Sequence, residues 1–371
     1  KLIYLFLALL IFACSSDDSS DNEGNEQSVC DEENPSKMIY LHSNGVTICA
    51  CDWALIGDNG VINGVIYEVL NESMLESRIQ SGLDVSNIVT TFIEDFRGMR
   101  SQNGVVGDLT TWDMSNVLYL AGLDGLNFPS SFNQDISNWD VSRVRTFNGL
   151  FAGTTFFNQP IGNWDLSNAR NLSSMFSDAQ AFNQPIGDWD VSKIEFMASM
   201  FEDATAFNQD IGNWDVSSVT DMSYMFEGNT VFNQDINSWD VSSVTDMSYM
   251  FKNSTFNQPI GDWDVSSVTD MSYMFKNSTF NQPIGNWDVS SVNGFNSFGM
   301  NEMFGFSNFN QDISSWDVSN VKKMYLMFYN ATSFNQDISS WDVDNVGDCR
   351  LFSQGAPLTE ANTPNFTNCT P

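Results

Sequence analysis

A repeat of about 25 residues fills most of the chain and limits the folds open to it. The pair Trp-Asp occurs ten times, and successive tryptophans are 27, 25, 25, 25, 25, 24, 24, 29 and 25 residues apart. Nine of the ten pairs follow the string Phe-Asn-Gln-(Asp/Pro)-Ile. One unit, residues 207–226, reads Phe-Asn-Gln-Asp-Ile-Gly-Asn-Trp-Asp-Val-Ser-Ser-Val-Thr-Asp-Met-Ser-Tyr-Met-Phe. Near-copies at one period indicate a repeat architecture.

The length of the unit selects among repeat folds. A propeller blade needs about 40 to 45 residues and a two-helix repeat needs 33 or more, so 25 residues suit one coil of a leucine-rich-repeat-like solenoid. The apolar residues often stand three apart, which also fits a helix, but Gly-Asn-Trp and Asn-Gln-Pro breaks argue against a long one. The predicted fold is mainly β, a solenoid of about ten 24–25-residue coils with short parallel strands and a small N-terminal α+β cap.

Within each coil, we place the short strand near Asp-Ile-x-x-Trp-Asp-Val, paired with the same segment of the neighbouring coils. The segment Asp-Met-Ser-Tyr-Met-Phe is expected to form a tight or one-turn helical corner. Prolines 160, 185, 259 and 283 would then stand at the first residue of a strand, where a missing N–H donor is tolerated.

A solenoid needs caps, because its end coils would otherwise expose core. Residues 38–108 form the predicted N-terminal cap, residues 109–352 the repeat solenoid and residues 353–371 the C-terminal cap. A degenerate first coil is expected to begin at Asp84, where Asp-Val-Ser-Asn-Ile-Val echoes the repeat.

The cap carries clear local signals. Segments 38–42 and 46–49 flank Ser-Asn-Gly, which predicts a hairpin, and segment 61–70 contains a second Asn-Gly pair. Asn71 is placed to cap a short helix over residues 72–80, which Gly82 would end.

The first residues predict export. Lys1 precedes twelve apolar residues, which are too few to span a bilayer and fit the apolar segment of a signal peptide. The following Ile-Phe-Ala-Cys resembles a bacterial lipobox, which implies cleavage after residue 13 and lipidation of Cys14; an ordinary secretory signal is the alternative. Residues 1–13 are then a lipoprotein signal peptide, and residues 14–37 a disordered acidic tether. The acidic residues just after Cys14 resemble signals that route lipoproteins to the outer face of some Gram-negative outer membranes; a solvated spacer is the alternative.

The remaining cysteines fit an oxidising compartment. Cys349, near the end of the last coil, and Cys369, in the C-terminal cap, are expected to form a disulfide. Cys30 has two candidate partners, Cys49 and Cys51, which would face the same way in a strand.

Composition excludes several functions. The chain has 14 Lys and Arg against 47 Asp and Glu, a net charge of −33. Such a charge argues against nucleic-acid binding and against docking on an anionic membrane surface, so a lipid anchor is the only membrane contact expected. His42 is the one histidine, which excludes a His-rich metal site and leaves a Ser-His-Asp triad with only that base. Equivalent aspartates in every coil suit a scaffold better than one active site, so no enzyme activity and no cofactor are predicted.

The aspartate after each tryptophan forms a predicted column of carboxylates. The leading interpretation is that each accepts hydrogen bonds from the following serine and from backbone donors at its turn. The alternative is a calcium ladder. The residues concerned are Asp113, Asp140, Asp165, Asp190, Asp215, Asp240, Asp264, Asp288, Asp317 and Asp342.

Two other columns have structural interpretations. The Asn-Gln pairs, such as Asn208 and Gln209, can hydrogen-bond to one another between coils. The tryptophans are expected in the core, although an exposed tryptophan stripe could instead bind carbohydrate.

The repeat Phe-Asn-Gln-Asp-Ile-x-x-Trp-Asp-Val-Ser-x-Val-Thr-x-Met-x-x-Met-Phe resembles that of the BspA-like leucine-rich-repeat surface proteins. The resemblance implies a non-catalytic, often lipid-anchored bacterial surface protein that acts in adhesion or recognises a host or matrix protein. A surface protein that binds carbohydrate through an exposed tryptophan stripe is the alternative. We expect a monomer. The candidate binding face is the small polar residue before tryptophan in nine coils: Asn138, Asn163, Asp188, Asn213, Ser238, Asp262, Asn286, Ser315 and Ser340.

Overall fold

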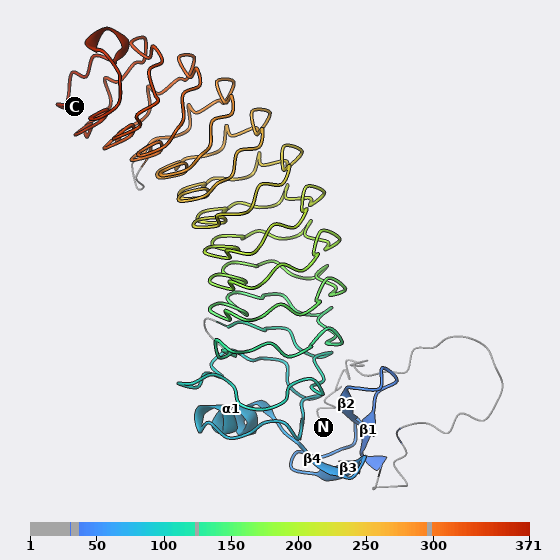
Figure 1. Cartoon of the computed structure of the whole chain (residues 1–371). Helices are drawn as coiled ribbons and strands as arrows, with labels where there is room; N and C mark the ends of the chain where they lie inside the picture. Colours follow the sequence, from blue (N-terminus) through green and yellow to red (C-terminus); the bar gives the residue numbers. More distant parts are fainter. Residues whose placement is uncertain (1–29, 31–36, 123–125, 295–298) are drawn as a thin grey trace, which may run out of the picture.

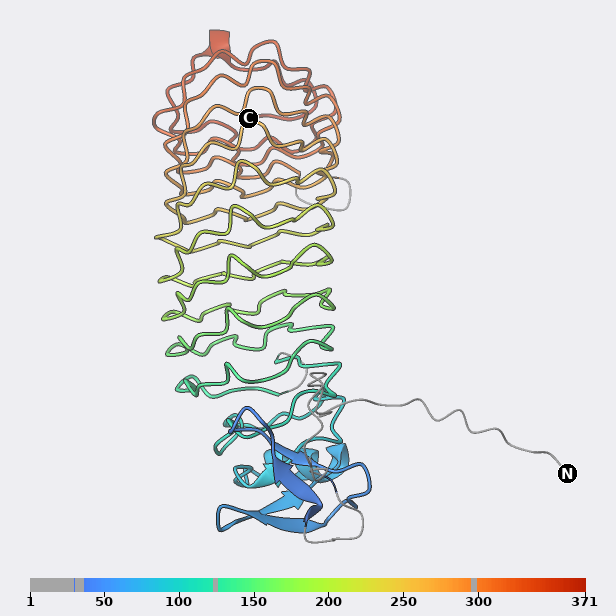
Figure 2. The same cartoon turned by 90° about the vertical axis from the view of Figure 1, so that its right-hand side faces the viewer.

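The computed structural model describes residues 30, 37–122, 126–294 and 299–371. The predicted signal peptide, Cys14 and nearly all of the predicted tether therefore lie outside the described residues. The coils stack along one curved axis, with two small sheets and one helix at the N-terminal end of the stack (Figures 1 and 2). Among the described residues, no helix has the length and apolar character needed to cross a membrane.

Two hairpins form the N-terminal sheets. Strands β1 (Ile39–Leu41) and β2 (Ile48–Ala50) pair antiparallel, while β3 (Asn59–Ile62) pairs antiparallel with β4 (Val65–Val69). The Asn-Gly pair between β3 and β4 occupies a tight turn, with φ of 52° and 83° at residues 63 and 64. Strand β5 (Ile88–Val89) joins β4 in parallel. The predicted hairpin around Ser-Asn-Gly is confirmed.

Helix α1 (Glu72–Gln80) forms as its sequence predicts. The side chain of Asn71 accepts a hydrogen bond from the backbone N–H of Met74, and Gly82 beyond the helix has a φ of 66°. Leu75 and Ile79 are buried and join the core of the coils, so the helix closes the first end of the stack.

A cysteine bridge ties down the start of the described chain. Cys30 bonds to Cys51, which settles the choice that the sequence left open. Cys49 is buried.

Each coil is a succession of tight turns. In one unit, Trp214 N–H donates to Ile211 O at 3.1 Å, and the same three-residue step joins Val219 to Val216 and Met225 to Met222. The first and last residues of these turns are all buried. The three-residue spacing of apolar residues therefore comes from turns and not from a helix.

The backbone bonds between coils lie elsewhere than the sequence predicts. Met222 N–H donates to Asp246 O at 3.0 Å, and Phe226 N–H donates to Met250 O at 3.0 Å in the next coil. Parallel bridges link the same position from Tyr119 through successive coils to Asp270. The pairing thus runs through Val-Thr-Asp-Met-Ser-Tyr-Met-Phe, which includes the expected corner Asp-Met-Ser-Tyr-Met-Phe. The strand predicted near Asp-Ile-x-x-Trp-Asp-Val and the strand role of the prolines are therefore wrong.

One apolar core runs through the stack. It extends without a break from Leu70 to Phe352. Phenylalanines of each coil stack on one another, as Phe201 does on Phe207 with ring centroids 3.8 Å apart. Because each ring also meets its counterpart in the next coil, neighbouring coils share one hydrophobic interior.

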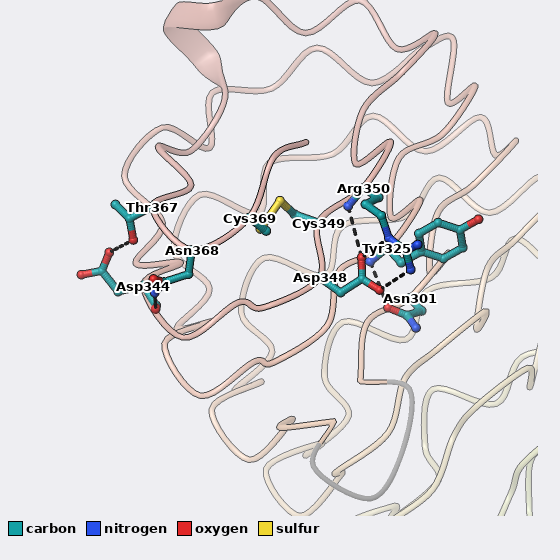
Figure 3. Close-up of a disulfide and its surroundings, with 9 residues drawn as sticks. All are labelled: Asn301, Tyr325, Asp344, Asp348, Cys349, Arg350, Thr367, Asn368 and Cys369. Atoms are coloured by element: carbon teal, nitrogen blue, oxygen red, sulfur yellow. Dashed lines mark hydrogen bonds and ion pairs between the residues drawn. A yellow bond between two sulfur atoms is a disulfide. The ribbon is translucent and has the colours of Figure 1, made fainter.

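The C-terminal segment closes the far end of the stack. It contains the short 3-10 helix η2 (Glu360–Asn362), and its Phe366 ring meets Phe352 edge-on at 5.0 Å. The expected disulfide between Cys349 and Cys369 joins this segment to the last coil (Figure 3).

Candidate functional site

The tryptophan column is part of the core. The ten side chains after position 111 are at most 5% exposed, and their ring planes are nearly parallel between coils. The indole Nε1–H of Trp239 donates to Ile211 O of the preceding coil at 3.1 Å, and the same bond recurs along the stack. The prediction of core tryptophans is confirmed, and the exposed stripe that would stack on sugars is absent from the described coils.

The Asn-Gln columns form an amide ladder between coils. The side-chain oxygen of Asn208 accepts a hydrogen bond from the backbone N–H of Asn233 at 3.1 Å and one from Gln234 Nε2 at 3.0 Å. The same arrangement links Asn158 to Gln184 and Asn281 to Gln311. These amides therefore hydrogen-bond neighbouring coils to one another, as the sequence predicts.

The aspartate column is held by turn hydrogen bonds. Asp215 Oδ1 accepts from the backbone N–H of Ser217 at 3.1 Å and from its hydroxyl at 2.6 Å. The hydroxyl bond is the main cause that lowers the pKa of Asp190, Asp240, Asp288 and Asp317. The leading interpretation from the sequence is thus confirmed. Within the described ranges, no group of three or more His, Cys, Asp or Glu side chains is arranged to hold a metal ion.

The nine polar residues before the tryptophans lie along one edge of the coils, and most are exposed. Several form hydrogen bonds between coils. Asn163 Nδ2 donates to Ser137 O at 2.9 Å, and the hydroxyls of Ser238 and Ser315 donate to glycine carbonyls of preceding coils. Asn163 also lines a cavity of about 420 Å³ with Pro160 and Pro185. Some polar groups of the nine residues before the tryptophans therefore bond within the stack and are not free to bind a ligand.

A row of stacked tyrosines, Tyr224, Tyr249 and Tyr273, is a stronger candidate surface. The three residues occupy the same position in consecutive coils and are half-buried. Adjacent rings are nearly parallel with centroids 4.3 Å apart. The hydroxyls of Tyr224 and Tyr273 hydrogen-bond to that of Tyr249. Burial is the main cause that raises the pKa of all three hydroxyls, so the row is uncharged at neutral pH.

Two ion pairs border the tyrosine row. Lys252 Nζ lies 2.6 Å from Glu227 Oε1 and 4.9 Å from the centre of the Tyr249 ring. In the following coils, Lys276 Nζ lies 2.5 Å from Glu302 Oε2 and 5.3 Å from the centre of the Tyr273 ring. The row thus combines flat aromatic rings with fixed charges of both signs.

The backbone at this position does not require tyrosine. Tyr224, Tyr249 and Tyr273 have φ between 60° and 62°, a conformation in which a bulky side chain is unfavourable. Gly149 and Ser174 hold the same place in earlier coils with φ of 63° and 55°. Since smaller residues satisfy the coil, the three tyrosines form a surface feature and not a folding requirement.

A second row of carboxylates lies beside the tyrosines. Asp221, Asp246 and Asp270 bridge one another in consecutive coils, and Asp270 is buried. Burial raises the pKa of Asp246, and the charges of Asp270 and Asp221 raise it further, despite opposing hydrogen bonds from Ser248. Ionisation of Asp246 is therefore opposed both by its burial and by the carboxylates of the neighbouring coils.

The tyrosine row was missed at the sequence level. Its signal was the unbroken repetition of Met-Ser-Tyr-Met-Phe in three consecutive coils. We assigned that segment to a corner, and corners are not expected to align side chains. His42, the single candidate base, lies by the turn between β1 and β2, where its Nδ1 accepts a hydrogen bond from Asn44 N–H at 3.3 Å.

Comparisons with known proteins identify the repeat. The family model DUF285, described as Mycoplasma protein of unknown function, matches residues 90–213, 196–299 and 255–366. No curated protein and no solved structure matches the chain. The three matches overlap and together run from residue 90 to residue 366, so the chain belongs to the DUF285 family of repeat proteins.

Proposed function

We propose that this protein is a non-catalytic cell-surface protein that recognises an extracellular protein through the tyrosine row. The observation that carries the proposal is three tyrosines stacked with 4.3 Å between ring centroids, at a position that smaller residues occupy elsewhere. Tyrosine is enriched in protein interfaces because it offers a large contact area and loses little conformational entropy.

The chemistry of the row favours a protein partner over a neutral sugar. The flanking pairs Lys252–Glu227 and Lys276–Glu302 present both charges beside the rings, which suits a mixed polar and apolar partner surface. The main support for a sugar ligand was an exposed tryptophan stripe, and the tryptophans are buried.

We further propose that the stack is a leucine-rich-repeat-like solenoid, acting as a monomer and anchored by lipid at Cys14 to the outer face of a bacterial outer membrane. The resemblance of the repeat to BspA-like surface proteins supports this, as does the short apolar segment before Cys14. A rigid stack on an acidic tether would hold the tyrosine row away from the membrane. No cofactor is required.

The test replaces all three tyrosines by serine, the residue that Ser174 and Ser199 supply at the same position. The protein and the variant are compared on arrays of extracellular matrix proteins and on glycan arrays. We expect a matrix protein to bind the parent and to lose about tenfold or more in affinity for the variant.

A matched control replaces Tyr329, a half-buried tyrosine outside the row, by serine. It should bind like the parent. The proposal fails if the triple variant retains full binding to the protein ligand, or if the parent binds only neutral glycans.

A further inference from the structure

An arginine cluster lies apart from the tyrosine row, near the N-terminal end of the stack. Arg143 and Arg145 of one coil and Arg170 of the next line a cavity of about 490 Å³, together with Leu118 and Asn168. The chain holds only 14 Lys and Arg in total against 47 acidic residues, so three arginines around one cavity depart from its general charge.

The backbone fixes two of these arginines side by side. Arg145 N–H donates to Leu118 O at 2.8 Å, and Arg170 N–H donates to Arg145 O at 2.9 Å in the same register of successive coils. Arg143 is oriented by its Nη1, which donates to Asn116 Oδ1 at 2.7 Å. The cluster therefore belongs to the rigid stack.

The positive charge of the cluster is poorly neutralised. Elsewhere, Arg97 and Arg350 lie 2.6 Å and 2.8 Å from a carboxylate oxygen. The nearest such pair for Arg170 is Glu195 at 3.9 Å, on an exposed surface. Among the described residues, Arg143 and Arg145 have no carboxylate oxygen within ion-pair distance.

The coil does not need arginine at these places. In a later coil, Ser218 occupies the position that Arg143 holds. Thr220 and Thr245 occupy the position that Arg145 and Arg170 hold in earlier coils. The Thr245 hydroxyl donates to Thr220 O at 3.1 Å, so a small hydroxyl residue satisfies the ladder. The fold therefore does not require arginine at these positions.

We propose that this cavity binds a small molecule through an oxyanion: a carboxylate, sulfate or phosphate group. Guanidinium groups bind such anions through paired hydrogen bonds, and the cavity has the size of a small-molecule site. A long polyanion is disfavoured because it would extend over coils that carry most of the chain's negative charge. The site is independent of the tyrosine row.

The test measures binding by calorimetry to the whole protein at low salt. The probes are inorganic phosphate, sulfate, glucose 6-phosphate and N-acetylneuraminate, with glucose as the neutral control and heparin as the long polyanion. We expect at least one small anion to bind, and its affinity to fall as sodium chloride is added.

The variant R143S/R145T/R170T carries residues that other coils hold at these positions, and should weaken anion binding about tenfold or more. K322T removes a positive charge at the equivalent position of a distant coil and should leave binding unchanged. If the triple variant fails to fold, R145T alone should weaken binding about threefold or more.

The comparison of ligands decides the chemistry. Preference for the sugar phosphate, the sialic acid or the inorganic ions identifies the source of the anion and supports the site. The proposal is overturned if none of the small anions binds, if only heparin binds, or if the triple variant binds as the parent does. Variants of the tyrosine row should leave this binding intact, so the two proposals can fail separately.

Discussion

The indole Nε1–H of Trp214 donates a hydrogen bond to the backbone carbonyl of Ile186, 3.1 Å away in the preceding coil. The side chain is 4% exposed, so this bond satisfies an indole N–H that water does not reach. The same carbonyl also accepts from the backbone N–H of Trp189 at 3.2 Å. One side chain thus fills its own coil and bonds to the coil before it.

Trp214→Ala should destabilise the protein by about 3 to 5 kcal/mol, because it leaves a large cavity and removes a hydrogen bond between coils. Trp214→Phe should cost less, since it loses the donor but keeps most of the ring. Urea melts followed by circular dichroism measure both. Asn213→Ser, which introduces the residue found at Ser238, is the control and should change little. Unchanged stability in Trp214→Ala would show that the column is not part of the core.

The amide ladder predicts that two substitutions of Asn208 differ in their effect on stability. Its side-chain oxygen accepts from two donors, Asn233 N–H and Gln234 Nε2. Asn208→Ala should therefore cost about 1 to 2 kcal/mol, whereas Asn208→Asp keeps the acceptor and should cost less. Thermal melts of the two variants test the ranking. Equal losses would mean that the donor side of the amide matters as much.

The stacked carboxylates should weaken the fold at neutral pH. Burial raises the pKa of Asp246, so the folded chain holds this proton at a pH where the unfolded chain has released it. Ionisation of Asp246 therefore opposes folding, and this destabilisation disappears as the pH falls through the folded-state pKa. Asp246→Asn should stabilise at pH 7 by about 1 kcal/mol and lose its advantage near pH 3.

The equivalent residue of another coil and a control variant support the test of Asp246→Asn. Asn171 stands at the equivalent position and its Oδ1 accepts from Ser173 N–H at 2.8 Å, so asparagine fits the turn. Asp240→Asn is the control of opposite sign, because the Ser242 hydroxyl lowers the pKa of Asp240 and its charged form favours folding above the unfolded pKa. A stabilisation by Asp246→Asn that persists at low pH would contradict the electrostatic explanation.

The aspartate column offers a test of calcium. Turn hydrogen bonds such as Ser217 to Asp215 predict that a chelator changes the melting temperature little, while sodium chloride raises it by screening repulsion. A calcium ladder predicts stabilisation of about 4 kcal/mol at a thousandfold excess over its dissociation constant. Melts at matched ionic strength separate the two. A calcium-specific rise of many degrees would make Asp140 to Asp342 metal ligands.

The anchor prediction concerns Cys14. Cys14→Ser should release the protein from the membrane fraction, because the thiol is the site of lipid attachment that the preceding apolar segment implies. Mass spectrometry of the native N-terminus should find a lipid-modified cysteine there. A chain that begins elsewhere without modification, or a disulfide at Cys14, would be the contrary result.

The period of the repeat predicted the stack of coils, the burial of tryptophan and the roles of asparagine and aspartate. It did not locate the bonds between coils. Ile211, Trp214 and Val216 have the β-branched and aromatic character of a strand, so the pairing was placed there. The actual ladder includes Tyr224 and Gly228 at positive φ, a conformation that strand propensities do not describe.

The candidate surfaces were harder to predict because they depend on alignment between coils. Tyr224 and Tyr249 are 25 residues apart and meet only when the register of the ladder is known. Arg145 and Arg170 likewise come together through a backbone bond just before the segment predicted to form a corner. The residues were visible in the sequence, but their proximity was not.

Residues 239–262 and 263–286 are 24-residue coils that differ only in their last residue, Asp262 and Asn286. Because each coil bonds only to its neighbours, loss or duplication of one such unit would join surfaces that already match. A single recombination between the two copies would change the reach of the molecule by about 4.8 Å. The chain could therefore vary its length in whole steps while the arginine cavity at one end and the disulfide at the other stay intact.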